Sequence, residues 1–326
     1  MANKKRDSEK KTLRPQDTTQ SPHKRRGIKD WNRQKKESAT AYLCLIPVFF
    51  GLTIISYIPT LLVFVMSLFD WNGLSAPKFV ALGNFAKIFT NDMYFYDSVR
   101  VTVVYAVIAV FWSLLYSLFI ALLLNRKIPA RGFWRAVFFI PYMLPAAGVF
   151  TAWRWLYEVN YGLINYGMRL LGLPPQQFLQ SPQQVLPSLA LIAVWCSGNL
   201  IVIFLAGLQN VPRVYVEAAQ IDGANGWQCF WHITIPSISP IIFYNVLMAL
   251  ISNLQVINPA LAITNGGPQN ESMFMSYIIY KYAFNENKIG YGSAYAAVFF
   301  VMVGIATFIL FRAYGSQLFG EGETKK

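Results

Sequence analysis

Six long apolar stretches constrain this chain more than any other feature of its sequence. A helix of about 20 residues crosses the hydrocarbon core of a bilayer, and six segments approach or exceed that length without an acidic residue. They are residues 41–69, 101–124, 136–155, 186–208, 238–263 and 291–311. Only 13% of the 326 residues are charged, against roughly 25% in a soluble domain. The sequence therefore predicts an all-α, polytopic membrane protein with six transmembrane helices and excludes a soluble enzyme.

The basic residues are concentrated near the N-terminus and predict the orientation of the spans. Residues 1–37 contain 13 of the 28 Lys and Arg residues, with few apolar residues, so we predict a disordered cytosolic tail over residues 1–40. The loop 125–135 has four basic residues and no acid, and the positive-inside rule places it in the cytosol as well. Six crossings return residues 316–326 to the cytosol as a second tail. Because most of the positive charge belongs to the first tail, we expect no nucleic-acid partner.

Two segments on the predicted outer side are more than simple linkers. Residues 157–185 predict a short amphipathic helix followed by a Pro-rich turn. Residues 272–284 are aromatic but too short to span a bilayer, so we expect them at the membrane interface, where Tyr and Phe are favoured.

The chain lacks the residues that several kinds of membrane machinery require. No Asp or Glu lies inside the predicted spans, whereas a proton-coupled carrier keeps a titratable group there. No Gly-Lys dipeptide is present for a phosphate-binding loop, and the three Cys and two His residues have no metal-ligand spacing. We therefore expect a non-catalytic chain that binds no cofactor or metal, and we expect energy for uphill transport to come from a partner.

The predicted cytosolic loop 210–236 forms a helix–turn–helix elbow. Pro212 is suited to the start of a helix, and Gly223 and Gly226 are predicted to end it. A second short helix is expected from about Trp227. In most membrane proteins such an elbow is only a connector.

A spaced set of residues gives this elbow a more specific meaning. The set is Glu217, Ala218, Ala219, Gly223, Ile233, Ile235 and Pro236. It resembles the EAA loop, E-A-A-x3-G-x9-I-x-L-P, of binding-protein-dependent ABC importer permeases, with Ile235 at the usual leucine position. By that resemblance the elbow docks in a cleft on a cytosolic ATPase subunit, where Glu217 would face a basic residue. The predicted docking residues are Glu217, Ala218, Ala219, Asp222 and Gly223.

Further turns narrow the family to carbohydrate-type permeases. Leu82-Gly83-Asn84-Phe85, Thr264-Asn265-Gly266-Gly267-Pro268 and Ala283-Phe284 are similar to turns of maltose and glycerol-3-phosphate permeases. The resemblance covers residues 41–315 and implies a type I ABC importer permease (MetI-like) core with cytosolic EAA coupling helices. It also implies a second permease subunit, an ATPase dimer that carries ATP and Mg²⁺, and an extracytoplasmic solute-binding protein.

Polar residues in the fourth and fifth spans predict a path for the solute. Asn245 and Asn253 share one helix face, and an amide in the bilayer either bonds to another helix or faces water. Asn and Gln suit sugar hydroxyls because they both donate and accept hydrogen bonds, and an aromatic ring can stack on a sugar. The predicted path residues are Asn253, Ser252, Asn245, Gln255, Asn199 and Trp195. For each of them, contact between helices is the alternative.

These features predict a permease subunit for a mono- or oligosaccharide in the bacterial cytoplasmic membrane, surrounded by lipid. The alternative is a secondary carrier for a neutral polar solute, which should show internal repeats and a titratable or ion-binding group. A membrane-embedded enzyme is a further alternative. It would need carboxylates at the membrane edge, where Asp70 and Glu158 are isolated.

Overall fold

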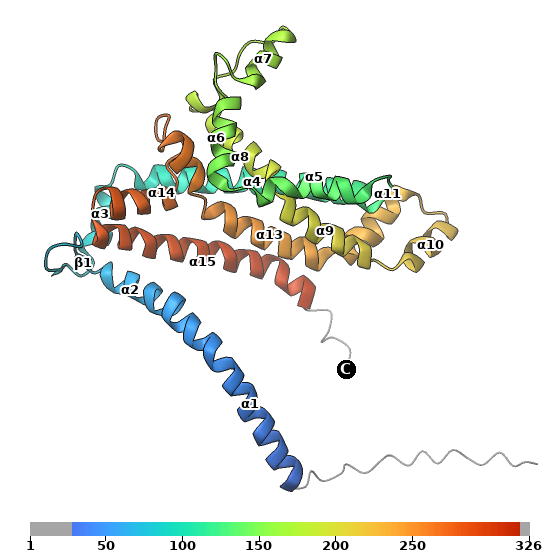
Figure 1. The fold of residues 1–326 in the computed structure, drawn as a ribbon, viewed down its shortest axis with the longest axis horizontal. Helices are drawn as coiled ribbons and strands as arrows, with labels where there is room; N and C mark the ends of the chain where they lie inside the picture. Colours follow the sequence, from blue (N-terminus) through green and yellow to red (C-terminus); the bar gives the residue numbers. More distant parts are fainter. Residues whose placement is uncertain (1–27, 320–326) are drawn as a thin grey trace, which may run out of the picture. The chain divides into compact units, whose positions relative to one another are not determined.

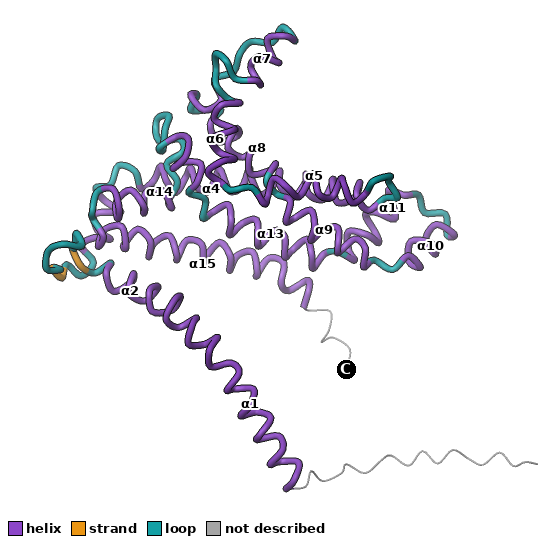
Figure 2. The backbone as a smooth tube through the Cα atoms, in the orientation of Figure 1, coloured by secondary structure: helices purple, strands orange, loops and turns teal. Residues whose placement is uncertain are grey.

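The computed structural model describes residues 28–319 and is mostly helical (Figures 1 and 2). The chain divides into two units, Met1–Pro59 and Thr60–Lys326. In the first unit, α1 (Ile28–Leu52) is followed by a π-helical turn, η1 (Thr53–Tyr57). Helix α2 (Ile58–Met66) begins at the end of that unit.

The structure describes part of each predicted tail as helix. Helix α1 begins at Ile28, so the prediction of disorder is wrong for residues 28–40. That stretch contains no Gly or Pro and many good helix formers, and it continues an apolar helix. At the other end α15 extends to Phe319. The remaining tail predictions, for residues 1–27 and 320–326, lie outside the described residues.

The second unit is a helical bundle with one small hairpin. Strands β1 (Phe69–Asp70) and β2 (Lys78–Phe79) pair antiparallel, with Phe69 opposite Phe79. The helices are α3 (Gly83–Thr90), α4 (Phe95–Asn125), α5 (Arg131–Met143), α6 (Ala146–Leu156), α7 (Leu163–Leu170), α8 (Val185–Trp195), α9 (Gly198–Asn210), α10 (Arg213–Ile221), α11 (Gly226–Cys229), α12 (Ile235–Ser237), α13 (Ser239–Leu254), α14 (Met275–Tyr280) and α15 (Ile289–Phe319). A 3-10 turn, η2 (Phe178–Gln180), precedes α8, and π-helical turns form η3 (Phe230–Thr234), η4 (Ala260–Thr264) and η5 (Lys281–Asn285).

Within residues 28–319, three helical stretches are long and apolar enough to cross a membrane unaided. They are Thr40–Met66, Phe95–Asn125 and Ile289–Tyr314. The other candidate spans are bent pairs: α5 with α6 at 96°, α8 with α9 at 50°, and Gly226–Ser237 with α13 at 67°. The expectation of six helical spans therefore holds if each bent pair counts as one span, as the chain then has up to six.

Local chemistry explains two of these bends. Pro145 has no N–H to donate and disfavours a helical conformation at Leu144, which is extended at ψ 144°. At the α8–α9 break, the hydroxyls of Ser117 and Ser197 share a hydrogen bond of 2.9 Å. A Cβ at Gly198 would lie only 2.9 Å from the Phe138 carbonyl oxygen. Glycine therefore lets α9 begin directly against α5.

Helix α4 is central to the core of this unit and packs against α8, α9 and α13. Two apolar clusters lie along it. The first includes Val101, Tyr105, Leu189, Phe274 and Tyr295, and the second includes Ile120, Leu124, Ile201, Phe204 and Ile238.

The aromatic segment 272–284 packs against α4 over its first half, whereas Phe284 at its end is 72% exposed, and its predicted place at the membrane interface stays a prediction. Phe274 and Met275 are fully buried, and Phe274 packs edge-to-face on Tyr105 with ring centroids 5.0 Å apart. The Met275 amide donates to Thr102 Oγ1 at 2.9 Å. This packing removes the apolar side chains at the start of the segment from solvent. The predicted short helix within residues 157–185 is confirmed as α7.

Candidate functional site

The elbow predicted from the sequence is formed by α10 and α11, at the end of the bundle opposite α3 and α14 (Figure 1). Helix α10 follows Pro212 and ends at Ile221, and Gly223, whose φ is +90°, lies two residues beyond its end. The Ala224 amide donates to the Ala219 carbonyl at 2.8 Å, and the Gly223 amide donates to the Gln220 carbonyl at 3.1 Å. These two bonds form a Schellman motif, whose left-handed position favours glycine. Gly223 therefore sets the turn of the elbow.

The start of α11 differs from the prediction. Gly226 is the first residue of this helix rather than the end of the preceding one. Asn225 Oδ1 accepts from the Gln228 amide at 2.9 Å, and the Asn225 amide donates to Gln228 Oε1 at 2.8 Å. This is a capping box, and the pair Asn225-x-x-Gln228 was the sequence signal that could have located the helix start.

The predicted docking residues gather on this elbow and face outward. Glu217, Ala218, Asp222 and Gly223 are exposed, and Ala219 is half-buried. Among residues 28–319 the Glu217 carboxylate has no ion-pair or hydrogen-bond partner. A charge exposed without an internal partner is available to another protein.

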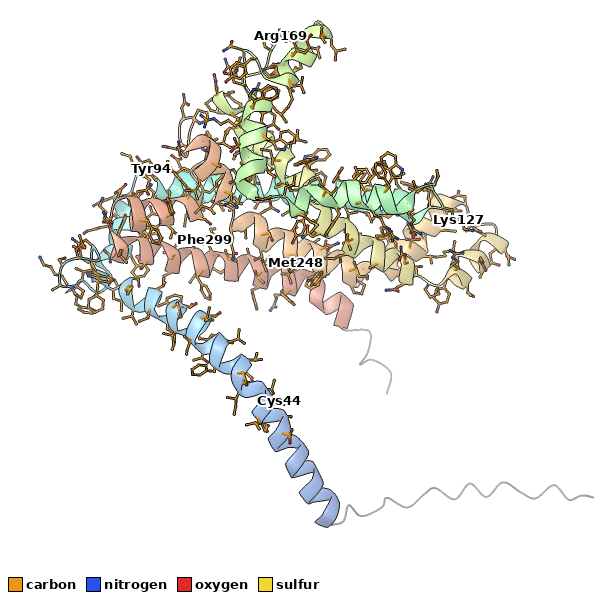
Figure 3. All side chains as sticks on the ribbon, in the orientation of Figure 1. Cys44, Tyr94, Lys127, Arg169, Met248 and Phe299 are labelled. Carbon is orange, nitrogen blue, oxygen red and sulfur yellow. The ribbon has the colours of Figure 1, made fainter. Side chains whose placement is uncertain are left out.

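A cavity of about 970 Å³ lies beside the elbow, between the end of α4, the start of α5, the end of α9, α10 and α11. We call it the basic cavity, because its charged lining is Arg126, Lys127, Arg131 and Arg213, with Glu217 the acidic residue. Figure 3 shows Lys127 at this end of the bundle. The sequence predicted that this loop and the elbow lie on one side of the membrane, but not that they enclose a common space.

The predicted path residues of α13 lie in different environments. Asn245 is fully buried and donates from Nδ2 to the Leu200 carbonyl of α9 at 3.4 Å. Asn253 is half-buried and donates to the Ala249 carbonyl of its own helix at 2.8 Å. Ser252 and Gln255 are exposed. Asn245 therefore acts as a contact between helices here, whereas the other three are accessible.

The predicted path residues of the fourth span flank the α8–α9 break. Asn199 is half-buried in the first turn of α9, next to the Leu200 carbonyl that Asn245 contacts. Trp195 ends α8 and packs edge-to-face on Trp153 of α6, with ring centroids 5.7 Å apart. Both tryptophans line an apolar cavity of about 360 Å³ between α6 and α8. No contact joins Trp195 to Asn253 among the described interactions, so a common surface for them stays a prediction.

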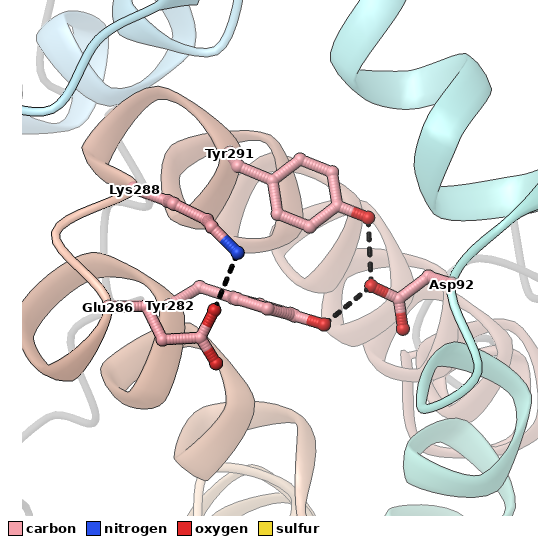
Figure 4. Close-up of polar contacts among 5 residues, drawn as sticks. All are labelled: Asp92, Tyr282, Glu286, Lys288 and Tyr291. Carbon is pink, nitrogen blue, oxygen red and sulfur yellow. Dashed lines mark hydrogen bonds and ion pairs between the residues drawn. The ribbon is translucent and has the colours of Figure 1, made fainter.

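A polar cluster at the opposite end of the bundle was not predicted (Figure 4). We call Asp92, Tyr94, Tyr282 and Tyr291 the Asp92 cluster. Asp92 Oδ2 accepts from the hydroxyls of Tyr282 at 2.7 Å and Tyr291 at 2.8 Å, and Oδ1 accepts from the Tyr94 amide at 2.8 Å. Asp92 and Tyr282 are 190 residues apart in sequence, so no local pattern could have joined them.

The electrostatics of the Asp92 cluster favour the ionised carboxylate. Burial alone would raise the pKa of Asp92, but the hydrogen bonds from Tyr282, Tyr291 and the Tyr94 amide together hold that pKa below its ordinary value. Burial, and then the hydrogen bond to Asp92, raise the pKa of Tyr282. Nearby, Lys281 Nζ lies 4.2 Å from the centre of the Tyr94 ring. The cluster holds the start of α4 against η5 and α15.

Comparisons with known proteins agree on one family. Residues 113–318 match the family described as binding-protein-dependent transport system inner membrane component. The probable ABC transporter permease protein YesP of Bacillus subtilis is 35% identical over 282 residues, which are 85% of this chain and 91% of YesP. The multiple sugar-binding transport system permease protein MsmF of Streptococcus mutans is 34% identical over 245 residues, 73% of this chain and 82% of MsmF.

A solved structure has the same fold. A chain in the crystal structure of a bacterial alginate ABC transporter, in complex with an alginate pentasaccharide-bound periplasmic protein, matches with a TM-score of 0.73. The match covers 85% of this chain and 94% of that one, at 18% sequence identity.

Proposed function

Because the chain belongs to the family of binding-protein-dependent transport system inner membrane components, we propose that it forms the translocation path for a carbohydrate together with a second permease. Family membership makes it a multi-pass membrane protein and a non-catalytic ABC permease subunit. It also decides against the alternative of a secondary carrier. We assign the permease domain to residues 41–315 and the coupling loop to residues 210–236.

The exposed elbow is the observation that carries this proposal. Glu217 presents a charge with no partner in the described part of the chain, beside the small side chains of Ala218 and Ala219. Gly223 sets the turn that follows. We infer that this surface docks on a cytosolic ATPase subunit, which binds ATP and Mg²⁺.

Coupling then follows from the order of elements along the chain. Helix α9 leads directly into α10, so a displacement of the elbow is transmitted to the α8–α9 break. In this proposal ATP closes the ATPase dimer, the elbows of both permeases move with it, and the path changes from inward-open to outward-open. A loaded solute-binding protein favours the outward-open state. The ATP-bound ATPase dimer and the loaded solute-binding protein therefore each bind the outward-open state more tightly than the inward-open state.

We propose a neutral sugar as the cargo. Asn253, Ser252 and Gln255 offer donors and acceptors on the accessible side of α13, and Asn199 and Trp195 offer an amide and a ring near the α8–α9 break. Hydroxyl groups suit such amides. The name of the Streptococcus relative, a multiple sugar-binding system permease, supports this cargo class.

The remaining partners and the location form part of the same proposal. An extracytoplasmic solute-binding protein delivers the sugar, and the periplasmic protein in the alginate transporter complex supports this partner. The chain lies in the bacterial cytoplasmic membrane with both termini in the cytosol. The basic loop 125–135 on the side of the elbow supports that orientation.

Charge reversal at Glu217 tests the coupling role. In the complex with its ATPase and second permease, Glu217→Lys should reduce sugar uptake at least tenfold and abolish stimulation of ATP hydrolysis by the loaded binding protein. The carboxylate has no internal partner, so thermal stability of this chain should not change. Arg312→Glu, a reversal at an exposed residue of α15 outside the elbow, is the matched control and should retain uptake. Normal stimulated hydrolysis in Glu217→Lys would rule out the docking role.

A substitution in α13 tests the cargo. Asn253→Leu should change the rates of uptake across a panel of mono- and oligosaccharides while the complex still assembles. Asn245→Leu is the comparison, because Asn245 is buried between helices and should affect stability more than sugar preference. An unchanged sugar profile in Asn253→Leu would mean that this amide lies outside the path.

A further inference from the structure

The basic cavity contains more positive charge than the described chain neutralises. Four cationic side chains and one carboxylate line its volume of about 970 Å³. Within residues 28–319, Arg126, Lys127, Arg131 and Arg213 form no ion pair. Like charges gathered without counter-charge repel one another, so the cavity is predisposed to bind an anion.

Arg131 is the most constrained of these cations. Its Nε is buried and has no hydrogen-bond partner. With the Gln209 amide oriented so that its oxygen faces the guanidinium groups, Oε1 accepts from Arg131 Nη2 at 3.0 Å and from Arg135 Nη2 at 2.7 Å. One neutral oxygen thus serves two guanidinium groups, and a buried donor remains unpaired. The guanidinium group therefore has fewer acceptors than donors, and an anion beside it in the cavity would add an acceptor.

The rest of the lining indicates what carries the anionic group. Apolar side chains form much of the wall: Leu122, Leu208, Val211, Val216, Trp227 and Phe230. The cavity lies beside the end of α4 at Asn125, where the long apolar stretch of that helix stops. A free phosphate would use only the cations, whereas a phospholipid would use both the cations and the apolar wall.

We propose that the basic cavity binds the phosphate of an anionic phospholipid from the cytosolic leaflet. The phosphate contacts Arg126, Lys127, Arg131 and Arg213, and the start of an acyl chain lies against Leu122 and Leu208. Glu217, the acidic lining residue, stands on the α10 side, where it is directed to the ATPase in the proposed docking. The lipid thereby links the loop after α4 to the coupling elbow. This binding site does not depend on which solute is transported.

Lipid binding to the purified complex tests this site. The probes are dioctanoyl phosphatidylglycerol, dioctanoyl phosphatidylcholine and inorganic phosphate, each titrated into the delipidated complex and followed by native mass spectrometry. We expect phosphatidylglycerol to bind at least tenfold more tightly than either of the other two. In Arg126→Gln/Lys127→Gln and separately in Arg131→Gln, that preference should fall at least fivefold. Arg312→Gln, a charge removal at an exposed residue outside the cavity, should retain it.

Other outcomes would overturn the proposal. Equal binding of the two lipids, or a preference unchanged in both cavity variants, would mean that anionic lipid does not occupy this cavity. Tight binding of inorganic phosphate without a preference for phosphatidylglycerol would assign the site to a soluble anion. Absence of phosphatidylglycerol binding to the complex would mean that the cavity is closed to lipid there. The double variant removes only exposed side chains without internal partners, so it should fold normally.

Discussion

The two ends of the bundle differ in whether their charged residues have partners within the chain. At the end that carries the Asp92 cluster, five charged residues meet partners within the chain: Asp92 accepts three hydrogen bonds, Arg100 pairs with Glu271 at 2.6 Å, and Lys288 pairs with Glu286 at 2.7 Å. At the end that carries the elbow, the lining cations and Glu217 have no ion-pair partners in the described chain. Internally satisfied charges stabilise a fold, whereas unsatisfied ones are available for binding. The first end therefore satisfies these charges internally, and the second leaves its charges available for binding.

Removing the Asp92 carboxylate should have the largest effect on stability. Asp92→Ala leaves two tyrosine hydroxyls and one amide without their acceptor, which we expect to destabilise the fold by about 2–3 kcal/mol. The melting temperature of the purified chain should fall by about 5 °C or more. Asp97→Ala, at a neighbouring acid whose carboxylate forms no hydrogen bond among residues 28–319, is the control. Equal melting temperatures for the two variants would contradict a stabilising role of the Asp92 cluster.

Acid should weaken the same end, with a smaller effect. The pKa of Asp92 is lowered in the fold, so the folded state binds fewer protons than the unfolded chain, in which the pKa is about 3.9. The stabilisation is fully present above about pH 4 and is lost as the pH falls through the folded pKa. Between about pH 5 and pH 3, wild type should lose more melting temperature than Asp92→Asn. Parallel curves for the two proteins would exclude Asp92 as the titrating group.

The exposed ion pair between Arg100 and Glu271, at the end that carries the Asp92 cluster, should contribute less to stability than Asp92 does. The side chains of Arg100 and Glu271 are 55% and 21% exposed, and pairs of this kind contribute about 0.2–1 kcal/mol. Arg100→Gln should lower the melting temperature by about 1 °C in low salt. Raising NaCl to about 1 M should remove the difference from wild type, because salt screens exposed charges. A loss that persists in high salt would indicate a packing role for the arginine stem.

Neutralising a charge in the basic cavity should have the smallest effect on stability. Unlike the three changes above, it should not destabilise the fold. Arg126→Gln removes a cation that has no internal partner and is close to other cations. We expect the melting temperature in detergent without anionic lipid to stay the same or rise slightly, by less than about 0.5 kcal/mol in stability. Lys288→Gln, which breaks the pair with Glu286, is the counterpart at the other end and should lower the melting temperature. Destabilisation by Arg126→Gln would mean that its charge is satisfied inside the chain.

The parts of this molecule that could be predicted from sequence are those encoded locally. The length of the apolar stretches indicates the number of candidate spans, and the position of Gly223 after Glu217 indicates the elbow. Bends were harder to predict: Pro47 and Pro141 lie inside helices, whereas Pro145 lies at a 96° bend. A proline alone therefore does not reveal from sequence whether a helix continues or bends.

The parts that could not be predicted depend on residues far apart in the sequence. Asp92 meets Tyr282 and Tyr291 only after α4 and α15 have packed. The basic cavity forms only where the loop after α4 meets α10 and α11. Polarity alone also gave Asn245 and Asn253 the same interpretation, although only Asn245 is fully buried. Their difference comes from the neighbouring α9, which no spacing along α13 could reveal.

The break between α8 and α9 gives the elbow a lever. Helix α9 has 13 residues, so at 1.5 Å per residue its arm is about 20 Å long. A rotation of about 10° at Ser197 would displace the far end by about 3 Å, roughly two residues of helical rise. The hydroxyl bond between Ser117 and Ser197 lies at the pivot, where displacement is least. A small angular change at the α8–α9 break and a displacement of several ångströms at the elbow are thus the same motion, seen at the two ends of one rigid helix.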